Sequence, residues 1–343
     1  MTLTATGRPA DQLRAQLPEP RGPLSAAVID LLRSPAGTAV PAGLGPDEDD
    51  PFGEDLQLAL HLCYELHYRS FAGVDDEWEW DPGLLALRRR AEGVFLGALR
   101  SATQGGTDVT AELGALLVEP ADGDGISHRL RDRGDWTWMR EYLVHRSIYH
   151  LKEADPHAWA VPRLQGRAKA ALVAVEFDEF GGGHARQMHS RLFEDLLTGA
   201  GLDPGYLRYL DVVPAPALAV VNMMSLFGLH RSLRGALVGH FAAAEITTGP
   251  SARRMAEALR RLGAPEECVR FYTEHIEADA VHEQLMRHDV VADLLDREPS
   301  LAADVVLGIQ ATELLEDRLA DHLRSCWDRQ VTSLRRPLPP SGR

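Results

Sequence analysis

The chain has 343 residues, of which 45% are hydrophobic and 25% are charged. This balance is typical of a folded globular protein and excludes wholesale disorder. Its 36 Lys and Arg residues are outnumbered by 51 Asp and Glu residues, so the formal net charge is −15. An acidic chain without a long basic run repels the phosphate backbone, which argues against nucleic-acid binding.

The cysteines and the hydropathy of the chain exclude further classes of protein. Cys63, Cys268 and Cys326 are far apart and form no Cys-x-x-Cys pair. This pattern excludes a disulfide scaffold and a cysteine-rich zinc module, and it favours a reducing compartment. The most apolar stretch, 215–229, is interrupted by Pro216 and is too short to span a bilayer. Because the N-terminus also lacks the apolar core of a secretory signal, we expect a soluble cytoplasmic protein.

The chain divides into four parts by composition. Residues 1–22, rich in Pro, Gly and small polar residues, predict a flexible arm. Residues 23–130 predict a helical extension with a break at 34–51. We expect a compact helical bundle over 131–330 and a flexible tail over 331–343.

Helical periodicity and Pro or Gly breaks place the elements. In chain order, helices are predicted over 55–71, 82–99, 136–153, 162–180, 184–199, 214–229, 231–247, 250–262, 265–294 and 299–328. We expect the long 265–294 stretch to bend. No segment combines alternating apolar and polar residues with β-branched enrichment, so the sequence predicts an all-α fold.

The strongest chemical signal lies in the 265–294 stretch. His275, Asp279 and His282 are spaced i, i+4 and i+7, so they share one narrow face of a helix. Two imidazoles and a carboxylate on one face form a metal-ligand pattern. By itself this pattern leaves metal binding and a solvated polar face about equally open.

Four further polar residues occur among helical apolar positions or at the end of a helix. Glu179 and His189 each occupy a place on an apolar stripe, where an unpartnered polar group would be costly. Glu245 continues the apolar stripe of the 231–247 helix, and Glu153 closes the 136–153 helix on a mixed face. We interpret the glycines 181–183 as a tight turn that brings Glu179 and His189 together, because no strand precedes them as in a phosphate loop.

Charge indicates how many metals such a set would hold. Glu153, Glu179 and Asp279 carry three negative charges, and Glu245 makes four. Two Fe(II) ions carry four positive charges, so the set is balanced by two metals and not by one. If these residues converge, we expect a dinuclear site.

Four blocks in order, Arg146–His157, Glu179–His189, Gly239–Glu245 and Glu274–Glu283, resemble the heme-oxygenase-like diiron oxidases, a family of iron-containing redox enzymes. The resemblance covers about residues 135–328 and implies a heme-oxygenase-like helical bundle that holds two non-heme irons. It also extends to the longer members with an N-terminal helical extension, including the N-oxygenase domains of nitrosourea-forming enzymes. We expect this protein to lack their C-terminal cupin domain, and therefore any cupin-dependent rearrangement step.

The resemblance implies a ligand set and a reaction. By position, Glu153, Glu179, His189, His275, Asp279 and His282 match iron ligands. Glu245 matches a carboxylate that joins the metals after oxygen arrives in some members. The implied enzyme uses two Fe(II) and O2 to oxidise a small amine or amino-acid-like substrate, by N-hydroxylation. It takes electrons from a separate ferredoxin or reductase, because the chain has no flavin or dinucleotide motif, and it forms a homodimer.

Other readings remain open at this stage. The same centre would also suit oxidative C–C cleavage of an amino or fatty acid, and a non-catalytic iron-binding protein would keep the same residues. Heme binding is disfavoured by the number of carboxylates. Arg146, Arg163 and Arg167 would suit either a substrate carboxylate or ordinary salt bridges. The other helical histidines are expected to be core or surface residues; they are His145, His150, His157, His240 and His322.

Overall fold

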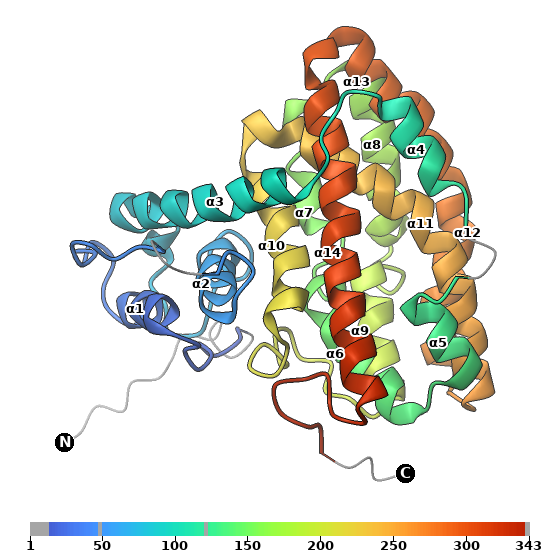
Figure 1. Cartoon of the computed structure of the whole chain (residues 1–343), viewed down its shortest axis with the longest axis horizontal. Coiled ribbons are helices and arrows are strands. Elements are labelled where there is room, and N and C mark those ends of the chain that lie inside the picture. Colours follow the sequence, from blue (N-terminus) through green and yellow to red (C-terminus); the bar gives the residue numbers. More distant parts are fainter. Residues whose placement is uncertain (1–13, 47–49, 120–122, 340–343) are drawn as a thin grey trace.

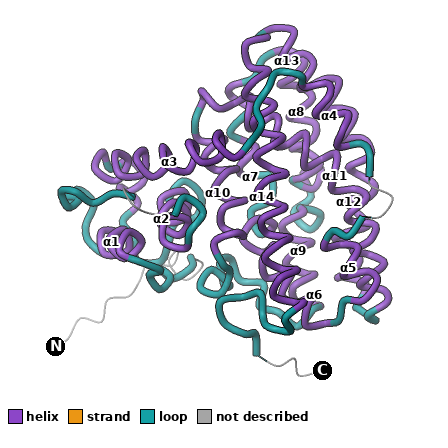
Figure 2. The backbone as a smooth tube through the Cα atoms, viewed as in Figure 1, coloured by secondary structure: helices purple, strands orange, loops and turns teal. Residues whose placement is uncertain are grey.

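A computed structural model describes residues 14–46, 50–119 and 123–339. Over these ranges the chain is helical and has no β-strand, only an isolated bridge between Ala15 and Phe71 (Figure 2). The predicted all-α fold is therefore confirmed. The helices are α1 (Pro23–Leu32), α2 (Glu54–Glu65), α3 (Pro82–Ala102), α4 (Val109–Leu116), α5 (Ile126–Arg133), α6 (Trp136–His150), α7 (Asp155–Ala158), α8 (Gly166–Glu179), α9 (His189–Gly199), α10 (Ala215–Leu229), α11 (Arg234–Arg261), α12 (Glu266–Gln284), α13 (Ala292–Arg297) and α14 (Ala302–Asp328).

The bundle is organised around α11, which packs along both α12 and α14 (Figure 1). Two glycines allow the close crossing of α11 and α14. A Cβ atom on Gly239 would lie 2.1 Å from the Val305 carbonyl oxygen, and one on Gly308 would lie 2.0 Å from the Ala236 carbonyl oxygen. Nearly every residue of α10 is buried, because this helix lies between the bundle and the N-terminal helices.

The N-terminal extension consists of two parts. Helices α1, α2 and α3 form a lobe beside α10, whereas α4 and α5 lie against α14 and α11 (Figure 1). The lobe joins the bundle through a buried polar contact that we call the lobe interface: Gln57, His61 and Glu65 of α2 against Lys152 and Asn222. Its central ion pair joins Lys152 Nζ to Glu65 Oε2 at 2.8 Å, with both side chains at most 1% exposed.

The predicted break at Gly249-Pro250 is wrong, because α11 runs through Pro250. A proline inside a helix removes one backbone hydrogen bond and costs about 3 kcal/mol or more. The second half of α11 buries Ala252, Met255 and Leu259 against its neighbours, and this burial offsets the cost.

The predicted 265–294 helix is interrupted by a π-helical segment, Leu285–Val291, between α12 and α13. Such segments insert a local bulge into a helix. The π-helical segment follows directly after the residues of α12 that the sequence marked as metal ligands.

The predicted flexible ends are held to the body where the structure describes them. In the predicted arm, residues 1–13 lie outside the described ranges, but Arg21 bonds Glu54 and the Leu210 carbonyl. In the predicted tail, Ser333 and Thr332 bond Glu141 of α6. These contacts pair polar groups that composition alone assigns to solvent. No described helix is long and apolar enough to cross a membrane.

Candidate metal centre

Six of the seven predicted ligands converge inside the bundle, where all six are buried. Glu153 lies in the turn after α6, and Glu179 and His189 lie at the end of α8 and the start of α9. Glu245 lies on α11, and His275 and His282 lie on α12. The side chain of Asp279, the seventh, lies outside the described residues.

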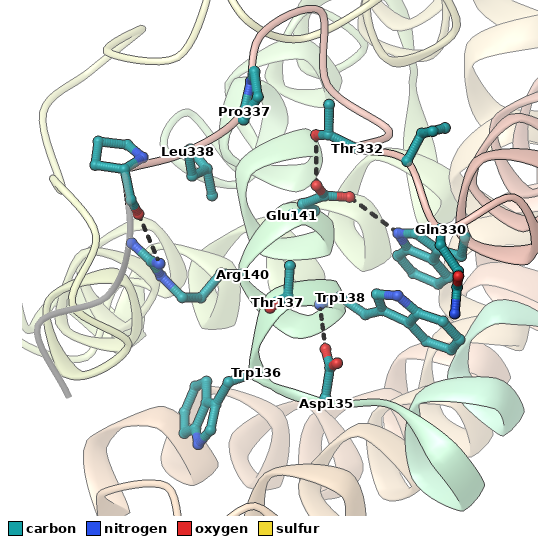
Figure 3. Close-up of a pocket in the computed structure, with 13 residues that line it drawn as sticks. Asp135, Trp136, Thr137, Trp138, Arg140, Glu141, Gln330, Thr332, Pro337 and Leu338 are labelled. Atoms are coloured by element: carbon teal, nitrogen blue, oxygen red, sulfur yellow. Dashed lines mark hydrogen bonds between the residues drawn. The ribbon is translucent and has the colours of Figure 1, made fainter.

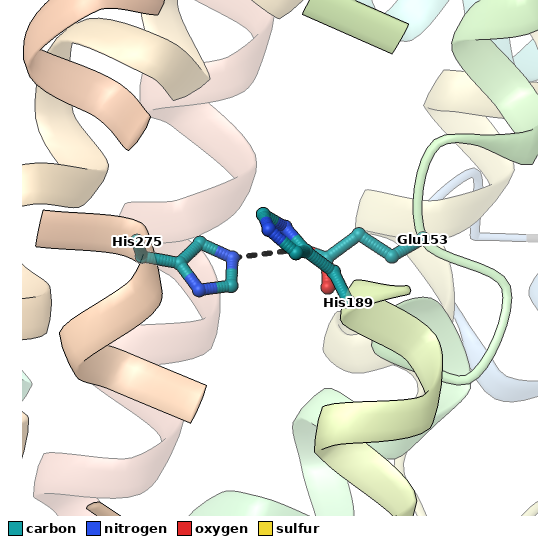
Figure 4. A group of neighbouring side chains, drawn as sticks. All are labelled: Glu153, His189 and His275. Atoms are coloured by element: carbon teal, nitrogen blue, oxygen red, sulfur yellow. Dashed lines mark ion pairs between the residues drawn. The ribbon is translucent and has the colours of Figure 1, made fainter. Parts of the chain in front are cut away.

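The six residues form two clusters of three. Glu153, His189 and His275 make the first cluster, and Glu179, Glu245 and His282 make the second. Within each cluster the candidate ligand atoms lie within 4.8 Å of one another. Figure 4 shows the three side chains of the first cluster pointing toward one another, with His275 Nε2 3.5 Å from Glu153 Oε1.

A direct contact joins the two clusters, since His189 Nδ1 lies 2.8 Å from Glu179 Oε2. The three glycines between these residues have φ angles of 73°, 59° and 83°, in the left-handed region. A Cβ atom on Gly181 would lie 2.5 Å from the Met188 nitrogen. The glycine turn therefore brings Glu179 and His189 together, as its sequence suggests.

The donor set fits iron. Imidazole nitrogens and carboxylate oxygens suit non-heme iron, among other metals. Among the described residues, none of the three carboxylates pairs with Lys or Arg, and Glu153 Oε2 is buried without a hydrogen-bond partner. Buried carboxylates without cationic partners are costly, and bound metal ions would remove that cost.

A sequence profile of the family described as "iron-containing redox enzyme" matches residues 140–317, which are 178 of the 343 residues. The chain belongs to this family. The resemblance drawn from the four sequence blocks is thereby confirmed, and the matched span contains all seven predicted ligand positions.

Nitrosourea synthase from Streptomyces achromogenes subsp. streptozoticus is 27% identical to this iron-containing redox enzyme over 177 residues. The match covers 51% of this chain and 38% of the relative. The chain therefore corresponds to less than half the length of that protein.

In this iron-containing redox enzyme, contacts outside the two clusters fix the orientation of the His275 and His282 rings. His275 Nδ1 lies 2.7 Å from the Phe271 carbonyl oxygen, so it donates there and turns Nε2 toward Glu153. His282 has the opposite orientation, because Nδ1 faces Glu245 and Glu179 while Nε2 lies 3.3 Å from Asp178 Oδ2. His275 and His282 thus each present one ring nitrogen to their cluster, and the contact of the other nitrogen fixes the orientation of the ring.

The two clusters shift the pKa values of their residues in different ways. Burial raises the pKa of Glu153, but His150 and His275 outweigh burial and hold that pKa below its ordinary value. Burial lowers the pKa of His282, but Glu245, Glu179 and Asp178 outweigh it and raise that pKa to about 9. Burial also raises the pKa of Glu245. Without metal, the second cluster therefore retains a proton that metal binding would displace.

A cavity of about 560 Å³ opens onto the first cluster, with His275 in its wall. Arg146 and Glu316 face each other in this cavity through two hydrogen bonds of 2.7 and 2.6 Å. Their side chains remain 23% and 35% exposed although they lie inside the bundle. Of the three arginines considered from sequence, Arg163 instead bonds backbone carbonyls and Arg167 pairs with Asp289 and Asp293.

A second cavity, of about 570 Å³, lies at the other end of α6 (Figure 3). There Trp138 stacks on Trp327, and Glu141 accepts hydrogen bonds from Trp327, Thr332 and Ser333. Its buried carboxylate is fully paired, so this cavity is a structural junction with the C-terminal segment.

Three residues around the centre were not predicted from the sequence. His150, placed with the ordinary histidines, has Nδ1 2.8 Å from Glu153 Oε1. Asp178 holds His282, and Glu176 lies one turn before Glu179. The i, i+3 spacings of His150 with Glu153 and of Glu176 with Glu179 were visible signals, but a helical spacing does not show which neighbour faces inward.

Proposed function

We propose that this iron-containing redox enzyme is a diiron oxygenase that uses O2 to oxidise a small amine or amino-acid-like substrate by N-hydroxylation. The observation that carries the proposal is the pair of adjacent three-residue clusters, joined through Glu179 and His189. A mononuclear site needs only two histidines and one carboxylate. Here each of two neighbouring positions has its own histidine and carboxylate donors.

In this proposal Glu153, His189 and His275 would hold one iron, and Glu179, Glu245, His282 and Asp279 would hold the other. Iron at these positions supplies the redox chemistry of O2 reduction. Phe271 and Asp178 keep the His275 and His282 rings in ligating orientation. Glu245, on the neighbouring helix α11, would supply a further carboxylate to the metals.

The cavity beside His275 supports the substrate class. Its volume of about 560 Å³ lies in the range of small-molecule sites. Arg146 offers a guanidinium to a substrate carboxylate, and Glu316 offers a carboxylate to a substrate amine. We further propose that the enzyme is a cytoplasmic homodimer and that a separate ferredoxin or reductase supplies the electrons.

Anaerobic titration of metal-free protein with Fe(II), followed by mixing with O2, tests the proposal. We expect two Fe(II) per chain and O2 consumption that depends on an amine or amino-acid substrate and on reductant. Binding of two irons without sustained O2 consumption would instead indicate an iron-binding protein. Binding of one iron or none would contradict the diiron assignment.

Product analysis by mass spectrometry separates the two reactions that the centre would support. N-hydroxylation adds one oxygen atom from ¹⁸O2 and keeps the carbon skeleton. Release of a shortened carbon skeleton would indicate oxidative C–C cleavage. An Arg146→Met variant is expected to raise KM for an amino acid more than for the amine that lacks its carboxylate, because only the amino acid loses a charge-assisted hydrogen bond.

A further inference from the structure

Glu176 is a buried acid beside the second cluster. It lies on the buried face of α8, one turn before Glu179, and is only 4% exposed. Neither of its carboxyl oxygens has a hydrogen-bond partner among the described residues. Buried polar side chains are normally paired, so an unpaired carboxyl group calls for a reason.

Glu141 is a buried glutamate with a structural role, and its hydrogen bonds provide a comparison for Glu176. It has the same exposure of 4%, but its two oxygens accept hydrogen bonds from Trp327 and Thr332 (Figure 3) and from Ser333. Glu176 has no such set of donors. Burial alone therefore does not account for its position.

The surroundings of Glu176 favour its neutral form. Burial is the main cause that raises its pKa, to about 9, and the negative charges of Glu179, Glu245 and Asp155 add to it. His282 on α12 is the nearby group that opposes them. Arg167, at the other end of α8, is nine residues away and pairs with Asp289 and Asp293. Burial is the largest of these causes and does not depend on metal, so the buried and unpaired side chain is a carboxylic acid that carries a transferable proton.

The charge of the centre also favours a neutral acid over a further ligand. In the proposed function, two Fe(II) ions would already balance the four carboxylates Glu153, Glu179, Glu245 and Asp279. A fifth carboxylate would leave an excess negative charge in a buried site, which is unfavourable.

We propose that Glu176 is a proton donor to the oxygen-reducing centre. The inference rests on the proposed function. N-hydroxylation converts R–NH2, O2, two protons and two electrons into R–NHOH and water. The O–O bond breaks, one oxygen forms the N–O bond, and the other leaves as water. The external reductant supplies the electrons, and Glu176 supplies one of the two protons.

The test compares the wild type with Glu176→Gln, which keeps the shape of the side chain but has no acidic proton. Glu176→Asp, which restores an acid, tests rescue, and Glu194→Gln, at a partly exposed position on α9, serves as the control. We expect Co(II) titration to give two metals per chain with unchanged affinity in every variant. A loss of Co(II) affinity in Glu176→Gln alone would identify a ligand and overturn the proposal.

The metal-free protein gives a readout that is independent of activity. The folded wild type holds the Glu176 proton up to about pH 9, whereas the unfolded chain loses it near the ordinary glutamate pKa. Wild-type stability should therefore fall relative to Glu176→Gln as pH rises through that window. A difference that does not change with pH would show an ionised Glu176 and contradict the proposal.

With reductant and substrate, Glu176→Gln should lower kcat about a hundredfold, within the usual range for a general acid, and Glu176→Asp should recover part of it. An unchanged kcat, or a loss equalled by Glu194→Gln, would refute a proton-donating role. If the wild type itself binds no metal or consumes no O2, the proposed function fails. The pH-dependent stability then still reports separately on the neutral acid.

Discussion

The lobe interface and the metal centre are both buried and charged, but their charges are partnered in opposite ways. At the lobe interface Glu65 accepts from Lys152 and Tyr206, and Asn222 donates to Gln57. At the metal centre carboxylates face one another and histidines, without Lys or Arg among the described residues. The lobe interface pairs its buried carboxylate with a lysine, whereas the carboxylates of the second region have no such partner, and this difference is why we propose metal binding there.

The largest expected effect is the loss of a metal. His275→Ala removes one imidazole from the first cluster, and we expect Co(II) or Fe(II) stoichiometry to fall from two per chain to one. Absorbance titration and metal analysis measure this. The exposed His184→Ala serves as the matched control, because it removes an imidazole near the glycine turn but outside both clusters. Equal losses in both variants would contradict the assignment.

At the lobe interface the expected effect is on stability. Lys152→Met leaves Glu65 buried without its cation, which should lower the free energy of unfolding by about 3–5 kcal/mol. Combining it with Glu65→Leu should recover part of that loss, although Tyr206 then lacks its acceptor. Denaturant unfolding measures both variants. A single variant as stable as the wild type would show that the pair is not needed at this interface.

The stability of the metal-free protein should depend on pH, because carboxylates surround His282 at the centre. In the folded protein the pKa of His282 is about 9, above its ordinary value near 6.5. Its contribution to the free energy of unfolding is therefore complete below pH 6.5 and disappears as pH rises toward 9. We expect about 1–3 kcal/mol to be lost over this interval, and His282→Gln should remove that part of the slope. Metal-loaded protein should not show it, because metal displaces the proton.

The smallest effect is expected at Asp178, which contacts His282 from outside the cluster. Asp178→Asn should weaken metal binding about tenfold at the second cluster and leave the first unchanged. Competition with a chelator measures the two affinities. A loss confined to the first cluster would contradict the orientation assigned to His282.

Much of this centre was accessible from sequence because it depends on local geometry. The i, i+7 spacing of His275 and His282 places both on one face of any helix, and three consecutive glycines predict a tight turn between Glu179 and His189. The all-α fold follows from helical periodicity over most of the chain. The resemblance to a known family then indicated that these residues belong to one set of metal ligands.

Tertiary contacts decided the rest. Pro250 is a local break signal, and only the buried face of the second half of α11 shows that the helix continues. Glu176 and Glu141 are both buried glutamates on helices, and only the partners that the fold brings to Glu141 distinguish them. Helical spacing determines which residues share a face, because it follows from 3.6 residues per turn. It does not determine what lies opposite that face, since this depends on the packing of helices far apart in the chain.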